Sequence, residues 1–349
     1  MEKFMRAAVM TGIGRIEMQT LPVPVPKDNE VLVRIRHVGI CGSDLHYYEH
    51  GRIGNYVVDK PMILGHECGG EVVSYGSAVK GLQPGDKVAI EPGWTCGTCE
   101  FCRSGKYNLC PDVVFMATPP YDGAFCEYVS YPAQVVFKLP DSMDTMEGAL
   151  IEPLSVGLHA AAQAGASIGE TAAVLGSGCI GLCTMMALRA RGVAAIYMTD
   201  VLQKRLDMAS TLGAEAAWKA DALNVTDALM NVTGGRGVDC VFETAGSTLA
   251  TKQTVDLVAR GGRIVLVGMA PDAVMPFDFG TLMGKEASIN TVFRYRNLYP
   301  TAIRAVASGL IPVKRIVTNT FPFEQTMEAM RYSSENKRDI IKTVITFGA

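Results

Sequence analysis

The sequence predicts an α/β protein with two parts, a β-rich part and a doubly wound parallel sheet. Three observations lead to this fold class. The 349 residues exceed the usual length of one domain, about 150 residues, so two domains are expected. Short apolar runs separated by Pro and Gly fill residues 1–154. From residue 171 onward, similar runs alternate with helical stretches.

The β-rich part is inferred from short apolar runs with turn residues between them. These runs lie at residues 6–10, 31–36, 71–75, 87–90 and 127–131. Strands of this length, bounded by Pro and Gly clusters, are typical of an irregular antiparallel barrel or sandwich. We therefore expect such a domain over residues 1–154.

The second part shows a regular alternation of strand and helix patterns. Six strands are expected, at residues 172–176, 194–200, 214–218, 238–243, 263–268 and 288–292. Helix candidates at residues 180–190 and 203–212 lie between them. Strands that alternate with helices form a parallel sheet. We expect this domain over 155–293, followed by a mixed segment over 294–349.

Composition and charge argue against several classes of partner. The net charge is -3 and no basic run occurs, so nucleic acid and anionic membrane surfaces are not expected to bind. The N-terminal stretch lacks the apolar core of a signal peptide, and the apolar run at 174–190 is interrupted by glycines. We expect a cytoplasmic protein with reduced thiols.

A dinucleotide fingerprint opens the parallel sheet. Gly176, Gly178 and Gly181 follow a strand and start a helix, where they permit a tight turn, close approach of a pyrophosphate and close helix–strand packing. Asp200 ends the next strand, roughly 20 residues on, where a carboxylate binds the adenosine ribose. Its charge favours NAD over NADP, although Arg205 is close enough in sequence to bind a phosphate. The alternative is a glycine-rich turn beside a surface Asp.

Four cysteines lie close together in the first part. Cys96, Cys99, Cys102 and Cys110 form a CxxCxxC motif followed by a fourth thiol. In a reducing compartment, this set predicts a closed tetrahedral zinc site, which would be structural because no coordination position is left open. An iron–sulfur cluster is one alternative, and four buried thiols without a metal are another.

A second set of potential ligands is dispersed along the chain. Cys41, His66, Glu67 and Glu152 each lie in an apolar, glycine-rich segment, where an unpaired charge would be costly. A thiolate, an imidazole and a carboxylate with water in the fourth position are typical of catalytic zinc. The spacing alone leaves open whether these residues bind a metal or are ordinary core and surface residues.

These motifs together resemble those of the zinc-containing medium-chain dehydrogenases. The resemblance rests on GHECGGEVV, CGSDLH, the four-cysteine segment and GSGCIG. The longer segments HVGICGSDLHYYEHGRIGNYVV, GALIEPLSVGLHA and TVFRYRN are similar to those of sorbitol (polyol) dehydrogenases. The resemblance implies a GroES-like β-rich catalytic domain, an inserted Rossmann domain, and a C-terminal return to the catalytic domain.

The resemblance also implies roles for individual residues. Cys41, His66 and Glu67 would bind the catalytic zinc, and Glu152 would hold its water or replace Glu67. Ser43 and His46 would relay the released proton, with Glu152 as another possible base. The implied substrate contacts are Tyr47, Glu152, Arg294 and Tyr295. The implied cofactor contacts are Gly176, Gly178, Ile180, Gly181, Asp200, Arg205, Val267, Gly268, Met269, Val292, Phe293 and Arg294.

The expected activity is oxidation of a secondary hydroxyl of a polyol, of the sorbitol, xylitol or galactitol type, to a ketose with NAD. Two zinc ions per chain and a homotetramer are expected from the resemblance. Alternatives with the same chemistry are a simple diol, an amino alcohol or a phosphorylated polyol. A catalytically silent protein that keeps the fold and the NAD site is a different class, and it should have lost a zinc ligand. The sequence retains them all.

Overall fold

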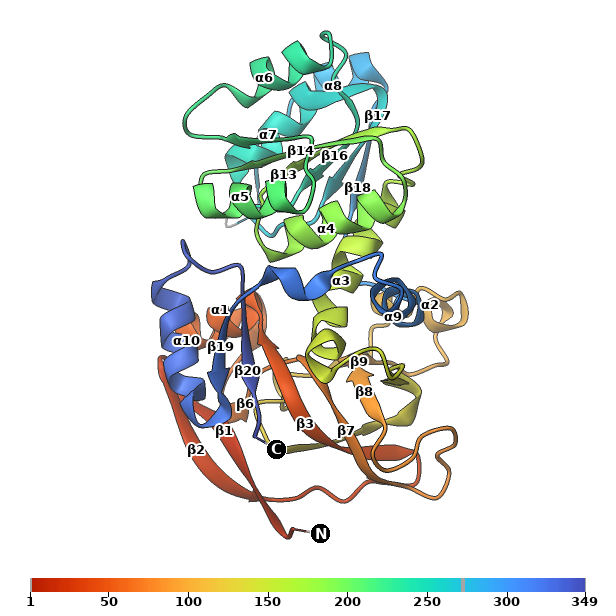
Figure 1. Cartoon of the computed structure of the whole chain (residues 1–349), viewed down its shortest axis with the longest axis vertical. Coiled ribbons are helices and arrows are strands. Elements are labelled where there is room, and N and C mark those ends of the chain that lie inside the picture. Colours follow the sequence, from red (N-terminus) through yellow and green to blue (C-terminus); the bar gives the residue numbers. More distant parts are fainter. Residues whose placement is uncertain (1, 271–273, 349) are drawn as a thin grey trace. The chain divides into compact units, whose positions relative to one another are not determined.

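The computed structural model describes residues 2–270 and 274–348. It divides into two compact units (Figure 1). The first unit comprises Met1–Glu152 and Tyr299–Ala349, and the second comprises Pro153–Leu298. The boundary between the units falls within helix α3 (Thr145–Gln163). The chain therefore builds most of the first unit, continues into the second, and returns to complete the first.

The first unit is mainly β-structure. Its strands are β1 (Phe4–Gly12), β2 (Arg15–Pro22), β3 (Glu30–Ile40), β4 (Arg52–Ile53), β5 (Tyr56–Val57), β6 (Met62–Ile63), β7 (Glu67–Tyr75), β8 (Lys87–Ile90), β9 (Gly93–Trp94), β10 (Val114–Phe115), β11 (Tyr128–Pro132), β12 (Val136–Lys138), β19 (Val317–Pro322) and β20 (Lys342–Thr346). Its α-helices are α1 (Gly42–His50), α2 (Glu100–Arg103), α9 (Tyr299–Ala307) and α10 (Thr326–Glu335). Its 3₁₀ turns are η1 (Tyr107–Leu109), η2 (Ala133–Val135), η3 (Val313–Ile316) and η4 (Phe323–Gln325).

The largest sheet of this unit has the strand order β12-β8-β7-β3-β20-β19, and β11 also pairs with β3. A three-stranded sheet, β2-β1-β6, and two small two-stranded sheets complete the unit. The paired strands are antiparallel, as expected, except for β19 and β20. This parallel pair departs from the antiparallel expectation because helix α10 joins the two strands as a crossover connection.

Strand β3 lies at the centre of this sheet, between β7 and β20 (Figure 1). Its register places Gly39 opposite Glu67 on one side and Ile40 opposite Thr343 on the other. The end of β3 therefore meets the start of β7 and the start of β20. Segments from both ends of the chain are brought together at this point of the sheet.

The second unit contains a six-stranded sheet with helices on both sides (Figure 1). The strands are β13 (Thr171–Leu175), β14 (Ala195–Asp200), β15 (Ala216–Lys219), β16 (Val238–Glu243), β17 (Val258–Leu266) and β18 (Ser288–Thr291). The helices that follow α3 are α4 (Cys179–Ala190), α5 (Gln203–Thr211), α6 (Val225–Val232), α7 (Thr248–Leu257) and α8 (Phe279–Lys285). The order β15-β14-β13-β16-β17-β18, with every neighbouring pair parallel, is that of the Rossmann fold. The predicted fold class is confirmed.

Two strands of this sheet have different bounds from those expected. β15 begins at Ala216 rather than at residue 214, because Gly213, with φ of 94°, and the residues after it form the turn that follows α5. β17 begins at Val258, before the glycines at 261 and 262 that favoured a later start. Alanine and glycine have weak strand propensity, so the sequence pattern is least informative at such positions.

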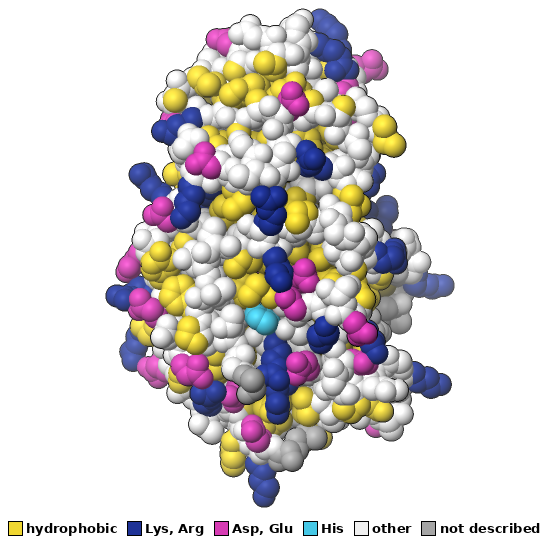
Figure 2. All heavy atoms as spheres, viewed as in Figure 1, with side chains coloured by type: hydrophobic (Ala, Val, Ile, Leu, Met, Phe, Trp, Pro, Cys, Tyr) yellow, Lys and Arg dark blue, Asp and Glu magenta, His cyan; other side chains and the backbone are white. Residues whose placement is uncertain are grey.

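Each unit has its own buried apolar cluster. On the face drawn in Figure 2, Lys and Arg side chains are interspersed with Asp and Glu, so no patch of a single charge dominates it. Within the described ranges, none of the helices combines the length and the apolar character that a membrane-spanning segment requires.

Candidate active site and metal centres

Three predicted ligands come together at the end of strand β3. Cys41 follows β3 and caps helix α1, while Glu67 begins β7 and His66 directly precedes it. One ligand atom from each of the three lies within 4.8 Å of the others. The pairing of Gly39 with Glu67 explains this convergence, because it places the end of β3 beside the start of β7. We call Cys41, His66 and Glu67 the open centre.

Asp44, to which the sequence reasoning gave no role, orients the open centre. Its buried carboxylate accepts hydrogen bonds of 2.9 Å from the backbone N–H groups of Cys41 and Gly65, and its Oδ1 lies 3.5 Å from His66 Nδ1. Burial, the largest influence, raises the pKa of Asp44, but His66 and the two N–H donors outweigh it and leave the pKa below its usual value. Fixing Nδ1 in this way leaves Nε2 of His66 as the metal-binding nitrogen. An Asp in the first turn of a helix, three residues after a candidate ligand, was the available signal.

Glu67 has a second partner that the sequence reasoning also missed. Lys342, the first residue of β20, places its Nζ 2.8 Å from both carboxylate oxygens of Glu67. The same ammonium donates to the carbonyl of Ile40 at 3.1 Å. The side chains of Lys342 and Glu67 are only 4% and 1% exposed. The signal in the sequence was a lysine within the apolar segment DIIKTVI.

The chemistry of the open centre fits zinc. A thiol, an imidazole and a carboxylate are the donor types found in catalytic zinc sites, which have three protein ligands and one open position. The thiol of Cys41 is half-buried beside the buried carboxylate of Glu67, and Lys342 supplies only one positive charge, so a thiolate here would gain from a further cation. The three residues therefore suit a divalent zinc ion that keeps one position for water or substrate.

The other predicted catalytic residues lie on α1 and α3. In the described part of the chain, the ligand cluster contains Glu67 but not Glu152, which is buried in α3. On α1, Tyr47 is buried, Ser43 is half-buried and His46 is exposed, with the His46 ring 4.6 Å from that of His50. These residues belong to the first unit.

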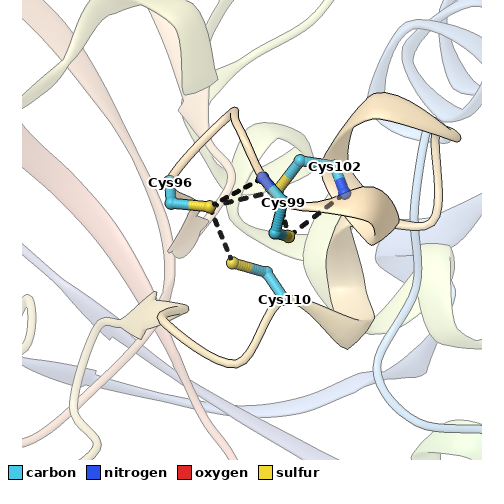
Figure 3. Close-up of side chains that lie close together, drawn as sticks. All are labelled: Cys96, Cys99, Cys102 and Cys110. Carbon is cyan, nitrogen blue, oxygen red and sulfur yellow. Dashed lines mark hydrogen bonds between the residues drawn. The ribbon is translucent and has the colours of Figure 1, made fainter.

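The four cysteines of residues 96–110 form a compact cluster (Figure 3). The Sγ–Sγ distances are 3.5 Å for Cys99–Cys102, 3.6 Å for Cys96–Cys110 and 3.9 Å for Cys96–Cys102. With Zn–S bonds of about 2.3 Å, a tetrahedral site has S–S edges of about 3.8 Å. None of the ten cysteines, all within the described residues, forms a disulfide. The cluster thus has the dimensions of a site for one zinc ion, whereas a cluster of several irons would hold the thiols farther apart.

The local backbone prepares this cluster for a cation. The N–H groups of Cys99 and Cys102 donate to the sulfurs of Cys96 and Cys99, at 3.4 and 3.5 Å. The Thr98 hydroxyl, followed by backbone N–H donors, lowers the pKa of Cys96 to about 6. A stabilised thiolate at Cys96 suits a zinc ion, because the thiolate is the form that binds the metal, whereas burial raises the pKa of Cys110 to about 12.

The fingerprint glycines have the conformations that the motif requires. Gly176 adopts a φ of 104°, which side chains disfavour. A Cβ on Gly181 would lie 1.8 Å from the carbonyl oxygen of Gly176, so only glycine fits. Gly178 caps helix α4, whose N-terminal N–H groups are of the kind that bind phosphate.

Asp200 lies at the end of β14, next to the fingerprint. Its carboxylate accepts hydrogen bonds from the N–H groups of Ser177, at 2.8 Å, and Leu202, at 3.0 Å. Nη1 of Arg205 lies 3.8 Å away. The carboxylate is therefore fixed beside the glycine turn, with one cation near it.

The remaining predicted contacts follow strands β17 and β18 in the second unit. The N–H groups of Val267 and Gly268 both donate to the carbonyl of Glu243, while Met269 and Phe293 are exposed. Arg294 adopts a φ of 55°, with its guanidinium 4.9 Å from the centroid of the Phe293 ring. Three further predicted residues lie in this unit: Ile180 is half-buried, Val292 donates its N–H to the carbonyl of Leu266, and Tyr295 is buried.

Known families match both units. The alcohol dehydrogenase GroES-like domain matches residues 27–141, and the zinc-binding dehydrogenase domain matches residues 179–308. The sorbitol dehydrogenase of Bacillus subtilis is 45% identical over 98% of this chain and 97% of its own length.

Solved structures agree with this relationship. An oxidoreductase/dehydrogenase of unknown specificity from Escherichia coli is 44% identical, with a TM-score of 0.96, and the match covers 99% of this chain and 100% of that one. A zinc-binding dehydrogenase from Sinorhizobium meliloti bound to NADP is 28% identical, with a TM-score of 0.92, over 99% of this chain and 100% of that one. The chain therefore belongs to the zinc-dependent medium-chain dehydrogenase family and is similar to its sorbitol dehydrogenases.

Proposed function

We propose that this chain oxidises a secondary hydroxyl of a polyol to a ketone, with NAD as the hydride acceptor and zinc in the open centre. The observation that carries the proposal is the convergence of Cys41, His66 and Glu67 within 4.8 Å. The similarity to the Bacillus subtilis sorbitol dehydrogenase supports a polyol as the substrate.

Bound at the open centre, zinc would act as a Lewis acid toward the substrate hydroxyl and lower its pKa. Cys41 and Glu67 supply two negative charges that match the charge of the ion, and Asp44 holds the His66 ring in place. Ser43 and His46 pass the released proton to solvent, a role that the exposure of His46 supports. Glu152 is the alternative base, because it is a buried carboxylate of the same unit.

The second unit binds the nucleotide, and NAD supplies the hydride acceptor. Phosphates bind at the start of α4, and the fixed carboxylate of Asp200 accepts hydrogen bonds from the ribose. A 2′-phosphate beside this carboxylate would be repelled, which favours NAD over NADP. Arg205 reduces that repulsion but does not cancel it, since its contact with Asp200 is long, at 3.8 Å. In terms of domains, residues 155–293 bind the nucleotide, while 1–154 and 294–349 form the catalytic domain.

The four-cysteine cluster holds a second, structural zinc, so the protein binds two zinc ions per chain. Its Sγ–Sγ distances of 3.5 to 3.9 Å support this assignment. The open centre would be replaceable, because it has only three protein ligands. Zinc in the four-cysteine cluster requires reduced thiols, which supports a cytoplasmic location, and the resemblance supports a homotetramer.

Specificity for polyols is assigned to polar side chains by the resemblance. It gives Tyr47 and Glu152 in the first unit, and Arg294 and Tyr295 in the second, as groups that bind the additional hydroxyls. Sites built in this way reject substrates that lack the matching hydroxyls.

A substrate panel and elemental analysis test the proposal. We expect two zinc ions per chain and NADH formation with sorbitol, xylitol or galactitol at a higher kcat/KM than with isopropanol, butanediol, threonine or a polyol phosphate. If isopropanol or 2-butanol is oxidised as efficiently as the polyols, the substrate assignment is wrong. One zinc in fully folded protein, or iron instead of zinc, would remove the assignment of the cysteine cluster.

A further inference from the structure

Lys342 introduces a positive charge beside the open centre from a distant part of the chain. It lies 275 residues after Glu67, and its Nζ is 2.8 Å from both carboxylate oxygens. A lysine that is 4% exposed is rare, because a buried ammonium must be paired. The register of β3 with β7 and β20 fixes this pairing, since both partner strands meet the last residues of β3.

The ammonium binds the same atoms that a metal would use. Glu67 can donate to a zinc ion only through its two oxygens, and both are hydrogen-bonded to Lys342. A positive charge at this distance withdraws electron density from the carboxylate and repels a second cation. The ammonium therefore competes with the metal for Glu67.

The Glu67 carboxylate has little freedom to rotate away from Lys342. Glu67 is 1% exposed, and a Cβ placed on Gly39 would lie 2.1 Å from its Oε2, so the backbone of β3 lies directly against it. The packing alone therefore restricts where Glu67 points. The main contribution of Lys342 is its charge rather than steric support.

We propose that Lys342 is a positioning residue that makes Glu67 a weak, displaceable zinc ligand and adds a positive charge beside the open centre. The inference rests on the proposed zinc in this centre. The charges of Cys41 and Glu67 balance the two charges of zinc, while Lys342 adds one positive charge beside Glu67 and Asp44 adds one negative charge beside His66. Asp44 has the opposite effect on His66, because a carboxylate hydrogen-bonded to an imidazole strengthens it as a ligand.

This arrangement has two consequences for the reaction. The positive charge of Lys342 favours the deprotonated form of a hydroxyl held at the centre, so Lys342 promotes loss of the proton. A weakly held Glu67 can also give way to another oxygen ligand, such as Glu152. The exchange between Glu67 and Glu152 is then governed by a residue of strand β20.

The test compares Lys342→Met and Lys342→Gln with the unmodified protein. Zinc in the open centre is measured by competition with EDTA. Cys41→Ser removes a ligand of that centre, so the zinc that this variant still holds is the zinc of the cysteine cluster. We expect the open centre to hold zinc about tenfold more tightly in both variants, because one repulsive charge has been removed. The acid limb of the kcat/KM–pH profile should move upward by about one pH unit. Lys342→Arg keeps the charge and should restore both properties.

Lys87→Met is the matched control. Lys87 belongs to the same unit and also donates to backbone carbonyls, those of Asp141 and Met143, without contacting the open centre. Zinc retention and the pH profile should not change in this variant. If Lys342→Met fails to fold, Lys342→Gln still decides the question, because its amide can donate to Glu67.

Two results would overturn the proposal. In one, zinc is lost more readily from the Lys342 variants, which means that Lys342 only holds Glu67 in place. In the other, zinc affinity and the pH limb are both unchanged, which means that the lysine only fills space. Zinc affinity is measured without substrate, so protein that binds zinc but oxidises no polyol would contradict the proposed function and leave this inference standing.

Discussion

Replacing Asp44 by Asn should weaken the open centre and destabilise the first unit. The two backbone N–H donors reach different oxygens of the carboxylate, with Cys41 donating to Oδ2 and Gly65 to Oδ1. The Asn side chain has only one oxygen, so its NH₂ group must face one of these N–H groups or His66. One charged hydrogen bond is lost, and one buried donor is left unpaired.

The magnitude follows from these contacts. A hydrogen bond to a charged group contributes about 1.5–3 kcal/mol, and the cost of the donor left unpaired lies in the similar range of about 1–3 kcal/mol, so losing this bond costs about 3 kcal/mol. For a unit of this size, that loss lowers the Tm by roughly 10 °C. Loss of a carboxylate partner of a ligating histidine typically weakens metal binding by about 10–100-fold.

The assay combines thermal unfolding with zinc retention against EDTA. Asp122→Asn is the control, because Asp122 also accepts one backbone hydrogen bond in the first unit, from Ile63 at 2.8 Å. The control should lose far less stability and no zinc affinity. If Asp44→Asn retains zinc as the unmodified protein does, then Asp44 does not orient His66 and the reasoning is wrong.

Four further predictions, which use five substitutions, test other parts of the protein. Cys99→Ser should unfold or aggregate the protein, whereas Cys41→Ser should leave it folded and inactive; circular dichroism with elemental analysis distinguishes these outcomes. Asp200→Ala should raise kcat/KM with NADP relative to NAD, and equal use of both cofactors by the unmodified protein would contradict the assignment. Arg294→Ala should reduce oxidation of polyols far more than of isopropanol, and equal losses would count against its role. Burial and then the charge of Arg296 lower the pKa of His159 to about 4, so stability should be complete above about pH 6.5 and fall as the pH drops toward 4. In urea titrations across that range, His159→Gln should show a smaller decline.

The parts of this protein that were predictable from sequence are those with local signals. Each strand–helix unit of the second part carries its own pattern, so the parallel sheet could be predicted from one stretch at a time. The four cysteines lie within residues 96–110, and their spacing alone indicated a shared cation. The antiparallel expectation for the first part was incomplete because the β19–β20 pair depends on a crossover helix near the C-terminus.

Asp44 and Lys342 could not be predicted in the same way. The Asp44 carboxylate contacts Gly65 and His66, which lie 21 and 22 residues further along the chain. Lys342 acts on a residue 275 positions earlier. Their roles depend on the register between strands, and composition and spacing do not encode a register between distant segments. The only local signals were the position of Asp44 in the first turn of a helix and, for Lys342, a charge within an apolar stretch.

The two metal centres therefore differ in how the chain builds them. The cysteine cluster is made by one short segment, with its N–H···S hydrogen bonds supplied by that segment itself. The open centre needs three strands: β3 ends directly before Cys41, β7 begins with Glu67, and β20 begins with Lys342. Because β20 is among the last elements of the chain, the ammonium of Lys342 lies beside Glu67 only once the C-terminal strand has joined the first unit. A site assembled in this way can be adjusted by changes in the C-terminal strand that leave all three ligands untouched.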